Sequence, residues 1–140
     1  MPAVPDLPAL DTRRLLLRPL SLDDAPAIQR IFPQWEVVRY LADQVPWPYP
    51  EDGARTYVEQ VALPAMRRGM QWHWSLRPRA EPQRLIGIIS LMRDEPGNNR
   101  GFWLDPEYRG QGYMTEASEA VTAYWFDVLG QPVLRARGAA

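Results

Sequence analysis

An apolar pattern of helical period near the end of the chain constrains the fold most. Seven residues recur at spacings of three and four: Ala117, Ala120, Val121, Tyr124, Trp125, Val128 and Leu129. This period predicts an amphipathic helix that begins near Gly112 and packs one face on the core. Gly130 and Pro132 follow directly, which is typical of a helix end.

Two glycines precede this helix in the stretch "DPEYRGQGYMTEA", residues 105–117. A helix N-terminus has unpaired N–H groups and about half a positive charge, and glycine lets an anion approach the backbone. Arg109 adds a forked donor and Thr115 adds a hydroxyl. The stretch therefore indicates a site for phosphate or diphosphate. The alternative is that Gly110 and Gly112 only form a tight turn beside a solvated Arg109.

Two other phosphate-binding motifs are excluded by the residues of this loop. The Rossmann pattern requires a third glycine three residues after the second, where this chain has Thr115. The Walker loop requires a lysine, and all 16 basic residues of the chain are arginines.

Strands are predicted in four places. In "QWHWSLR" (71–77) the residues alternate, with Trp72, Trp74 and Leu76 on one face and Gln71, His73, Ser75 and Arg77 on the other. The apolar run "RLIGIISLM" (84–92) predicts a central strand, and "EPGN" (95–98) predicts a turn into a strand at 100–105. The short run "RRLLLRPL" (13–20) predicts a first strand.

Three further helices and a last strand complete the prediction. Ser21 and Asp24 form a capping-box pattern before an apolar face of Leu22, Ala25, Ile28 and Phe32. "WEVVRYL" (35–41) predicts a short helix. A third helix over 51–69 would pack through Ala54, Tyr57, Val58, Val61, Ala62 and Ala65, with Pro64 ending or kinking it. "PVLRAR" (132–137) predicts the last strand.

This order of elements predicts an α+β fold, an α/β sandwich whose mixed, largely antiparallel sheet is flanked by helices. The length of 140 residues fits a single domain spanning 1–140, with residues 1–11 as a loose N-terminus. The net charge of −1 implies no general attraction to nucleic acid. The absence of cysteine and the single histidine argue against a thiolate or multi-histidine metal site. Without a secretion signal or an apolar membrane span, a cytoplasmic protein is expected.

The stretch "GFWLDPEYRGQGYMTEA" (101–117) resembles motif A of the Gcn5-related N-acetyltransferases (GNAT). The motif reads here as Arg109, Gly110, Gln111, Gly112, Tyr113, Met114, with Met114 in place of a small residue. "TRRLLLRPLSLDDA" and "VVRYLADQVPWPYPEDGARTYV" resemble the branch of ribosomal-protein N-terminal acetyltransferases of the RimJ and RimL type. The resemblance covers residues 12–137 and implies the GNAT acyl-CoA acyltransferase fold.

The resemblance also implies a function, which is direct transfer of an acetyl group from acetyl-CoA to a primary amine. The amine would belong to a protein N-terminus or to a small molecule. The pantetheine of acetyl-CoA would pair with the backbone of Phe102, Trp103 and Leu104. The diphosphate would lie on the loop and first helical turn, which comprise Arg109, Gly110, Gln111, Gly112, Tyr113, Met114 and Thr115.

No residue is an obvious general base. Many relatives have a glutamate just before the Gly-aromatic pair, where this chain has Asn99 and Arg100. His73 is the remaining candidate for the base, and Tyr108 and Tyr113 are candidate acids. Their structural alternatives are a solvated or hydrogen-bonded histidine and a tyrosine that packs around the loop together with Tyr108.

Two more side-chain pairs and the chain length bear on function. Trp47 and Tyr49 would line an acceptor pocket or cover the sheet, and Asp94 and Glu95 would be surface charges. The family fold continues with a helix and two strands beyond Ala140, so a C-terminally truncated domain is expected. Its exposed sheet edge would favour a homodimer or a strand-exchanged dimer. The alternatives to an enzyme are a non-catalytic acyl-CoA-binding or regulatory module and an inactive fragment.

Overall fold

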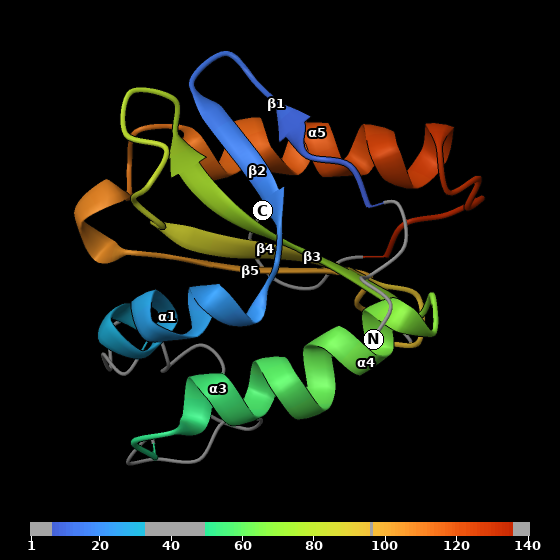
Figure 1. Ribbon diagram of the computed structural model, residues 1–140. Helices are drawn as coiled ribbons and strands as arrows, with labels where there is room; N and C mark the ends of the chain where they lie inside the picture. The colour runs from blue at the N-terminus through green and yellow to red at the C-terminus, as the bar shows by residue number, and fades with distance from the viewer. Residues whose placement is uncertain (1–6, 33–49, 96, 136–140) are drawn as a thin grey trace.

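Five antiparallel strands form one sheet with helices on both of its faces (Figure 1). The computed structural model describes residues 7–32, 50–95 and 97–135. The strands lie in sequence order, so each pairs with the next along the chain. Their bounds are β1 Leu10–Asp11, β2 Leu15–Pro19, β3 Gln71–Pro78, β4 Gly87–Met92 and β5 Arg100–Leu104. The predicted α+β class and the largely antiparallel sheet are confirmed.

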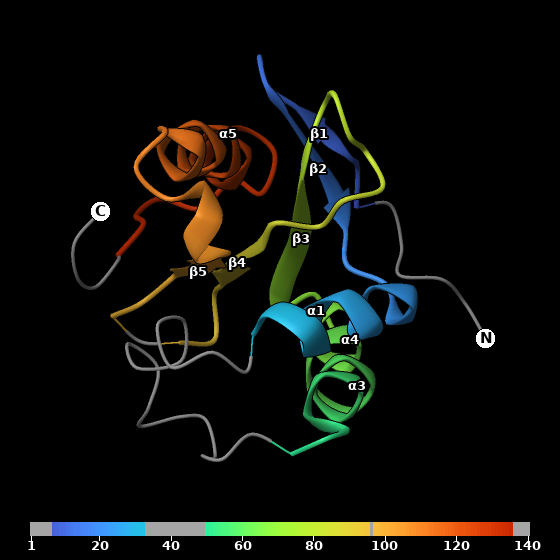
Figure 2. The ribbon, with the colours of Figure 1, turned by 90° about the vertical axis from the view of Figure 1, so that its left-hand side faces the viewer.

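The helices divide into two groups, one on each face of the sheet. The long helix α5, Tyr113–Asp127, covers one face. The other face carries α1 (Ala25–Ile31), α3 (Gly53–Tyr57), the π-helical turn η3 (Val58–Ala62) and α4 (Leu63–Arg67). Figure 2 shows α5 almost end-on, on the opposite side of the sheet from α1, α3 and α4. None of the helices in the described part of the chain has the length and apolar character needed to cross a bilayer.

The apolar face predicted for α5 packs on the sheet as expected. Ala117, Val121, Tyr124 and Trp125 are buried against β2, β3 and β4. Val128 was predicted to share this face, but it is 65% exposed. The helix ends one residue earlier, at Asp127, whereas Leu129 and Leu134 beyond it pack on the core again.

Helix α1 begins at the predicted capping box. The Ser21 hydroxyl accepts a hydrogen bond from the Asp23 N–H, and the Asp24 carboxylate accepts one from the Ser21 N–H. These bonds satisfy N–H groups that a helix start leaves unpaired. The first turn is the 3-10 helix η1, Leu22–Asp24. Ile28 in the middle of α1 and Phe32 at its end are buried, as predicted.

The predicted helix over 51–69 forms, although Pro64 does not end it. Pro64 has no N–H to offer to the carbonyl of the preceding turn. The π-helical turn Val58–Ala62 comes just before it, and the Leu63 N–H donates to the Val58 carbonyl, five residues back. This wider turn accommodates the proline. Two residues predicted on the buried face are exposed, Tyr57 at 44% and Val61 at 48%.

Two expectations for the chain ends need correction. Leu10 and Asp11, assigned to a loose N-terminus, pair with β2 as strand β1. The strand predicted at 132–137 is not formed over 132–135, and residues 136–137 lie outside the described part. Arg135 instead donates its N–H to the Asn99 side-chain oxygen at 2.9 Å, and its carbonyl accepts from the Asn99 N–H. The helix predicted at 35–41, with Trp47 and Tyr49, also lies outside the described residues.

Candidate functional site

The site begins where β5 runs into α5. The Asp105 carboxylate accepts a hydrogen bond from the Glu107 N–H and starts a 3-10 turn, η4 Pro106–Tyr108. Gly110 and Gly112 follow with φ of +77° and +82°. An L side chain is strained in this left-handed region, so both glycines are required by the backbone path itself.

The first turn of α5 presents backbone donors that the protein does not use. Gly112 is the N-cap and has no side chain to accept a bond. Among the described residues, no acceptor lies at the N–H groups of Tyr113, Met114 and Thr115. Gly110, Gln111, Gly112 and Thr115 are exposed. These N–H groups lie at the positive end of a 15-residue helix, so the geometry fits the phosphate or diphosphate site predicted from sequence. We call this site, residues 109–115, the anion cradle.

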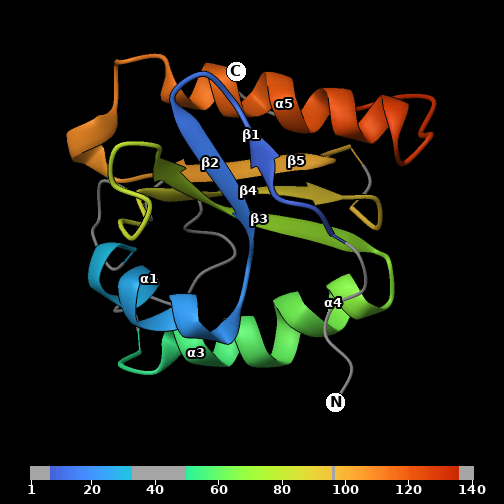
Figure 3. The same ribbon diagram turned by 45° about the horizontal axis from the view of Figure 1, so that its top comes forward.

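Residues from the start of the chain hold this cradle from one side. Arg14 donates from Nη1 to the Gln111 carbonyl at 3.0 Å and from Nε to the Glu116 carboxylate at 2.9 Å. Its guanidinium lies 4.4 Å from the centre of the Tyr113 ring. The Thr12 hydroxyl donates to the same carboxylate. Figure 3 shows the β1–β2 turn beside the start of α5. Arg14 was not predicted as a site residue. The one indication in the sequence was its position in the opening segment "TRRLLLRPL", which carries part of the family resemblance.

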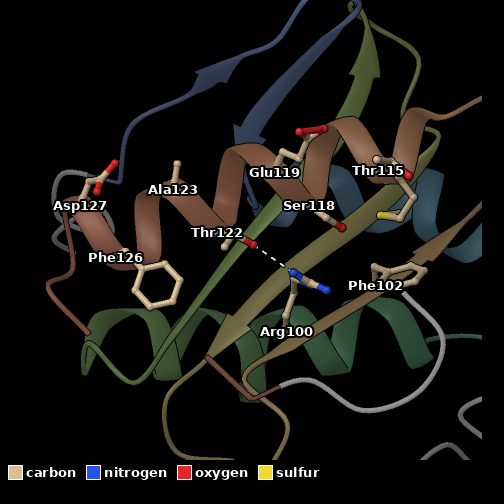
Figure 4. Close-up of a pocket in the computed structure, with 10 residues that line it drawn as sticks. Arg100, Phe102, Thr115, Ser118, Glu119, Thr122, Ala123, Phe126 and Asp127 are labelled. Atoms are coloured by element: carbon tan, nitrogen blue, oxygen red, sulfur yellow. Dashed lines mark hydrogen bonds between the residues drawn. The ribbon is translucent and has the colours of Figure 1, made fainter. Parts of the chain in front are cut away.

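A groove runs beside the cradle, between β5 and the outer side of α5 (Figure 4). It has a volume of about 690 Å³. Met114 and Thr115 line its end at the loop, and Phe102 and Phe126 contribute exposed aromatic rings. Arg100 projects into it and donates from Nη1 to the Thr122 hydroxyl at 3.0 Å. The groove joins the anion cradle to the edge strand.

The predicted strand residues do not share one environment. Phe102 faces the groove, whereas Leu104 is buried in the core beneath α5. Trp103 points to the other face and packs edge-to-face on Phe32, with ring centroids 5.3 Å apart. β5 is the last strand in the sheet order, so its outer backbone edge has no strand partner in the described part of the chain. An edge strand leaves backbone N–H and C=O groups with which the amides of a ligand can pair.

The candidate acid Tyr113 and the candidate base His73 are placed differently. Tyr113 lies at the loop, between the Arg14 guanidinium and the Tyr108 ring, whose centroid is 6.2 Å away. Tyr113 therefore packs around the loop together with Tyr108, which is the structural alternative to a catalytic role. His73 is far less accessible, with 1% of its surface exposed, on the sheet face that packs on α3 and α4.

Both ring nitrogens of His73 are occupied. Nδ1 lies 2.6 Å from the Ser90 hydroxyl and Nε2 lies 2.9 Å from the Gln71 side-chain oxygen. The Gln71 amide nitrogen donates to the Asp94 carboxylate at 3.1 Å, which orients its oxygen toward the histidine. Nε2 therefore carries the proton and Nδ1 accepts from Ser90. Asp94 is exposed, as expected for a surface charge, and it also anchors this network through Gln71. No ring nitrogen is left for a substrate.

Burial lowers the pKa of His73 to about 4, against a smaller opposing effect of the Asp94 charge. The unfolded chain takes up a proton at this histidine below pH 6.5, but the folded protein does not until about pH 4. Stability should therefore fall as the pH drops from 6.5 to 4, by up to about 3 kcal/mol from this residue. Denaturant unfolding of wild type and His73→Gln across this range tests the effect. The variant should lose this part of the pH dependence; an unchanged slope would contradict the assignment.

A protein-family model described as an acetyltransferase (GNAT) domain matches residues 14–140, which includes the sheet from β2 onward, the loop and α5. The chain belongs to the GNAT acetyltransferase family. The expectation of an acetyl-CoA-dependent acetyltransferase is thereby confirmed at the level of the family. The match begins at Arg14, the residue that contacts both Gln111 and Glu116.

Individual GNAT proteins agree with this assignment. The uncharacterized N-acetyltransferase YoaA of Bacillus subtilis is 30% identical over 123 residues, which cover 88% of this chain and 69% of that protein. An acetyltransferase structure from Agrobacterium tumefaciens matches with a TM-score of 0.71 and 25% identity, over 92% of this chain and 72% of that one.

RimL, a ribosomal L7/L12 alpha-N-protein acetyltransferase solved in complex with coenzyme A, has the same fold. It matches with a TM-score of 0.66 and 21% identity, over 84% of this chain and 67% of that chain. The GNAT acyltransferase fold implied by the resemblance is confirmed.

Proposed function

We propose that this chain binds acetyl-CoA at the Arg109–Thr115 loop and transfers its acetyl group to a primary amine. The observation that supports this most is the uncapped N-terminus of α5, with Gly110 and Gly112 in left-handed conformations. A diphosphate would accept hydrogen bonds from the amides of Tyr113, Met114 and Thr115. RimL, which shares the fold, was solved with coenzyme A bound.

The pantetheine arm would follow the outer edge of β5, from Leu104 toward Phe102. An edge strand offers alternating N–H and C=O groups, which the amides of pantetheine can pair with. The exposed ring of Phe102 would cover the arm from the groove. The thioester would then lie near the middle of β5.

The chemistry forms a C–N bond and breaks the C–S bond of the thioester. The deprotonated amine attacks the carbonyl, a backbone N–H of β5 would stabilise the oxyanion, and the leaving thiolate takes up a proton. An α-amine has a pKa of about 8, against about 10.4 for lysine, so it loses its proton more readily. Because the solved relatives include a protein N-terminal acetyltransferase, we favour a protein α-amine as the acceptor.

Calorimetry with acetyl-CoA tests the binding step. We expect saturable binding with a Kd between about 1 μM and 1 mM, the range in which enzyme KM values usually lie. Absence of binding at millimolar acetyl-CoA would overturn the proposal. Thiol release with N-terminal peptides and with small amines then identifies the acceptor class.

A second candidate is a protein that binds acyl-CoA without turnover. It is favoured by His73, the single histidine, whose two ring nitrogens are both hydrogen-bonded in the fold. Asn99 and Arg100 also occupy the place where many relatives have a glutamate. Binding with no thiol release above the hydrolysis rate, for any amine in the panel, would establish this candidate over the first.

Two expectations from the sequence stay predictions, the cytoplasmic location and the homodimer. The outer edge of β5, which has no strand partner among residues 7–32, 50–95 and 97–135, is the surface on which strand pairing between copies would occur. Acetyl-CoA would compete for this edge, so added ligand should shift any such dimer to monomer in sedimentation velocity.

A further inference from the structure

The loop that we assign to the diphosphate has few internal contacts that fix its conformation. Gly110, Gln111 and Gly112 are exposed, and two of the three adopt left-handed conformations. Gly112 offers no side chain to cap α5. The Gln111 side chain makes one long bond, 3.4 Å, back to the Glu107 carbonyl. A loop of this composition has many accessible conformations, so an external contact must select one.

Arg14 makes that contact. Its Nη1 donates to the Gln111 carbonyl, between the two glycines, and its Nε donates to Glu116 in the first turn of α5. Its Nη2 lies 3.3 Å from the place where a Cβ on Gly112 would be. One planar guanidinium therefore spans the loop and the helix start, which a lysine ammonium cannot do with the same geometry.

Arg14 also affects the charge at the start of α5, because it contacts the Glu116 carboxylate. A carboxylate in the first turn of a helix competes with an anionic ligand for the same positive end. Here the Glu116 carboxylate accepts from the Arg14 backbone N–H at 2.8 Å and the Thr12 hydroxyl as well as from Nε. Burial raises the pKa of Glu116, but the bonds from Thr12 and Arg14 outweigh it and the pKa lies below its usual value. The carboxylate stays charged, and Arg14 neutralises it.

Arg14 is itself held in place. Thr12 and Leu15 close the turn that carries it, with the Thr12 N–H donating to the Leu15 carbonyl at 2.9 Å and the Leu15 N–H to the Thr12 hydroxyl at 3.0 Å. The Arg79 N–H donates to the Arg14 carbonyl at 2.9 Å. The guanidinium is thus presented from a hydrogen-bonded turn between β1 and β2.

We propose that Arg14 is a positioning residue for acyl-donor binding, which holds the 110–112 loop in its ligand-binding shape and screens the Glu116 carboxylate from the diphosphate. This inference rests on the proposed function for its ligand. Its structural part, the ordering of the loop by Arg14, stands on the contacts above.

The kinetic test compares two acetyl donors. Arg14→Ala should raise the KM for acetyl-CoA about tenfold, with kcat within about twofold, because about one charge-assisted contact is lost. S-acetylpantetheine lacks the diphosphate, so its kcat/KM should be the same in wild type and variant. Arg14→Lys should give an intermediate KM. Equal losses for both donors would overturn the proposal, since they would indicate general damage.

The matched control is Arg79→Ala. Arg79 donates from Nη1 to the Thr12 carbonyl at 3.2 Å, in the same turn, and reaches no loop residue in the described part of the chain. This variant should leave the KM for acetyl-CoA unchanged. A rise equal to that of Arg14→Ala would assign the effect to the turn and would overturn the role of Arg14.

Hydrogen exchange of the free protein tests the structural part without any ligand. In Arg14→Ala the Glu116 amide, which donates to the Gly112 carbonyl, and the amides of residues 117–119 should exchange about tenfold faster, while those of β3 and β4 keep their protection. Unchanged exchange at the start of α5 would overturn the proposal even if the wild type binds acetyl-CoA. If the wild type does not bind acetyl-CoA, the proposed function fails, and faster exchange confined to the start of α5 would still support the positioning by Arg14.

Discussion

Replacing Gly112 with valine is expected to lower the affinity for acetyl-CoA about a thousandfold, equivalent to about 4 kcal/mol. Gly112 has φ of +82°, where a β-branched side chain is strongly disfavoured. The new Cβ would also lie 3.3 Å from the Arg14 Nη2. The loop must change its path, and the amides of α5 then no longer converge on one anion. Calorimetry with acetyl-CoA measures the loss.

Gly130→Val is the matched control for this strain. Gly130 has φ of +65° just beyond the other end of α5, and a Cβ added there would meet no described atom within 4 Å. Both variants should lose about 1–2 kcal/mol of stability, the cost of a left-handed L residue. Only Gly112→Val should lose acetyl-CoA binding. Comparable losses of affinity in the two variants would refute the assignment of the loop.

Removing the Asp24 carboxylate is expected to destabilise the fold by about 3–5 kcal/mol, the usual cost of leaving one member of a buried ion pair alone. Asp24 and Arg77 meet at 2.5 Å with 9% and 11% of their side chains exposed. Arg77 also donates to Ser75 and to the Pro82 carbonyl, so it cannot turn out to solvent easily. Asp24→Ala leaves this guanidinium charged and buried. Urea unfolding measures the effect.

The surface pair Arg55–Glu59 supplies the comparison. Its atoms are 4.0 Å apart, and 68% and 49% of the two side chains are exposed. Glu59→Ala should cost less than about 0.5 kcal/mol, as is usual for an exposed helical pair. A double variant, Asp24→Leu with Arg77→Met, should recover much of the loss of Asp24→Ala, because no charge remains buried. No recovery would mean that Asp24 acts mainly through the capping box.

Local patterns predicted the elements that depend on short-range physics. The period of two in 71–77 predicted β3, and the Ser21 and Asp24 pair predicted the start of α1. The paired glycines were placed correctly between a strand and a helix start, because φ and helix polarity are local properties. The residues of that loop were named as a diphosphate site from the loop itself and from the resemblance, and their ligand is still a proposal.

The errors come from contacts between distant residues. His73, Ser75 and Arg77 form a polar face in sequence, yet the fold buries all three. Burial turned His73 from a candidate base into a bonded core residue. Arg14 was missed because its partners lie about 100 residues away in sequence.

That separation has a consequence for how the site comes into being. Closing a contact between Arg14 and Glu116 spans 102 residues, so it is among the most non-local contacts of the fold. The loop can acquire its supported shape only after α5 has been synthesised and has docked against the opening strands. A nascent chain that has not yet docked α5 would therefore lack the supported loop.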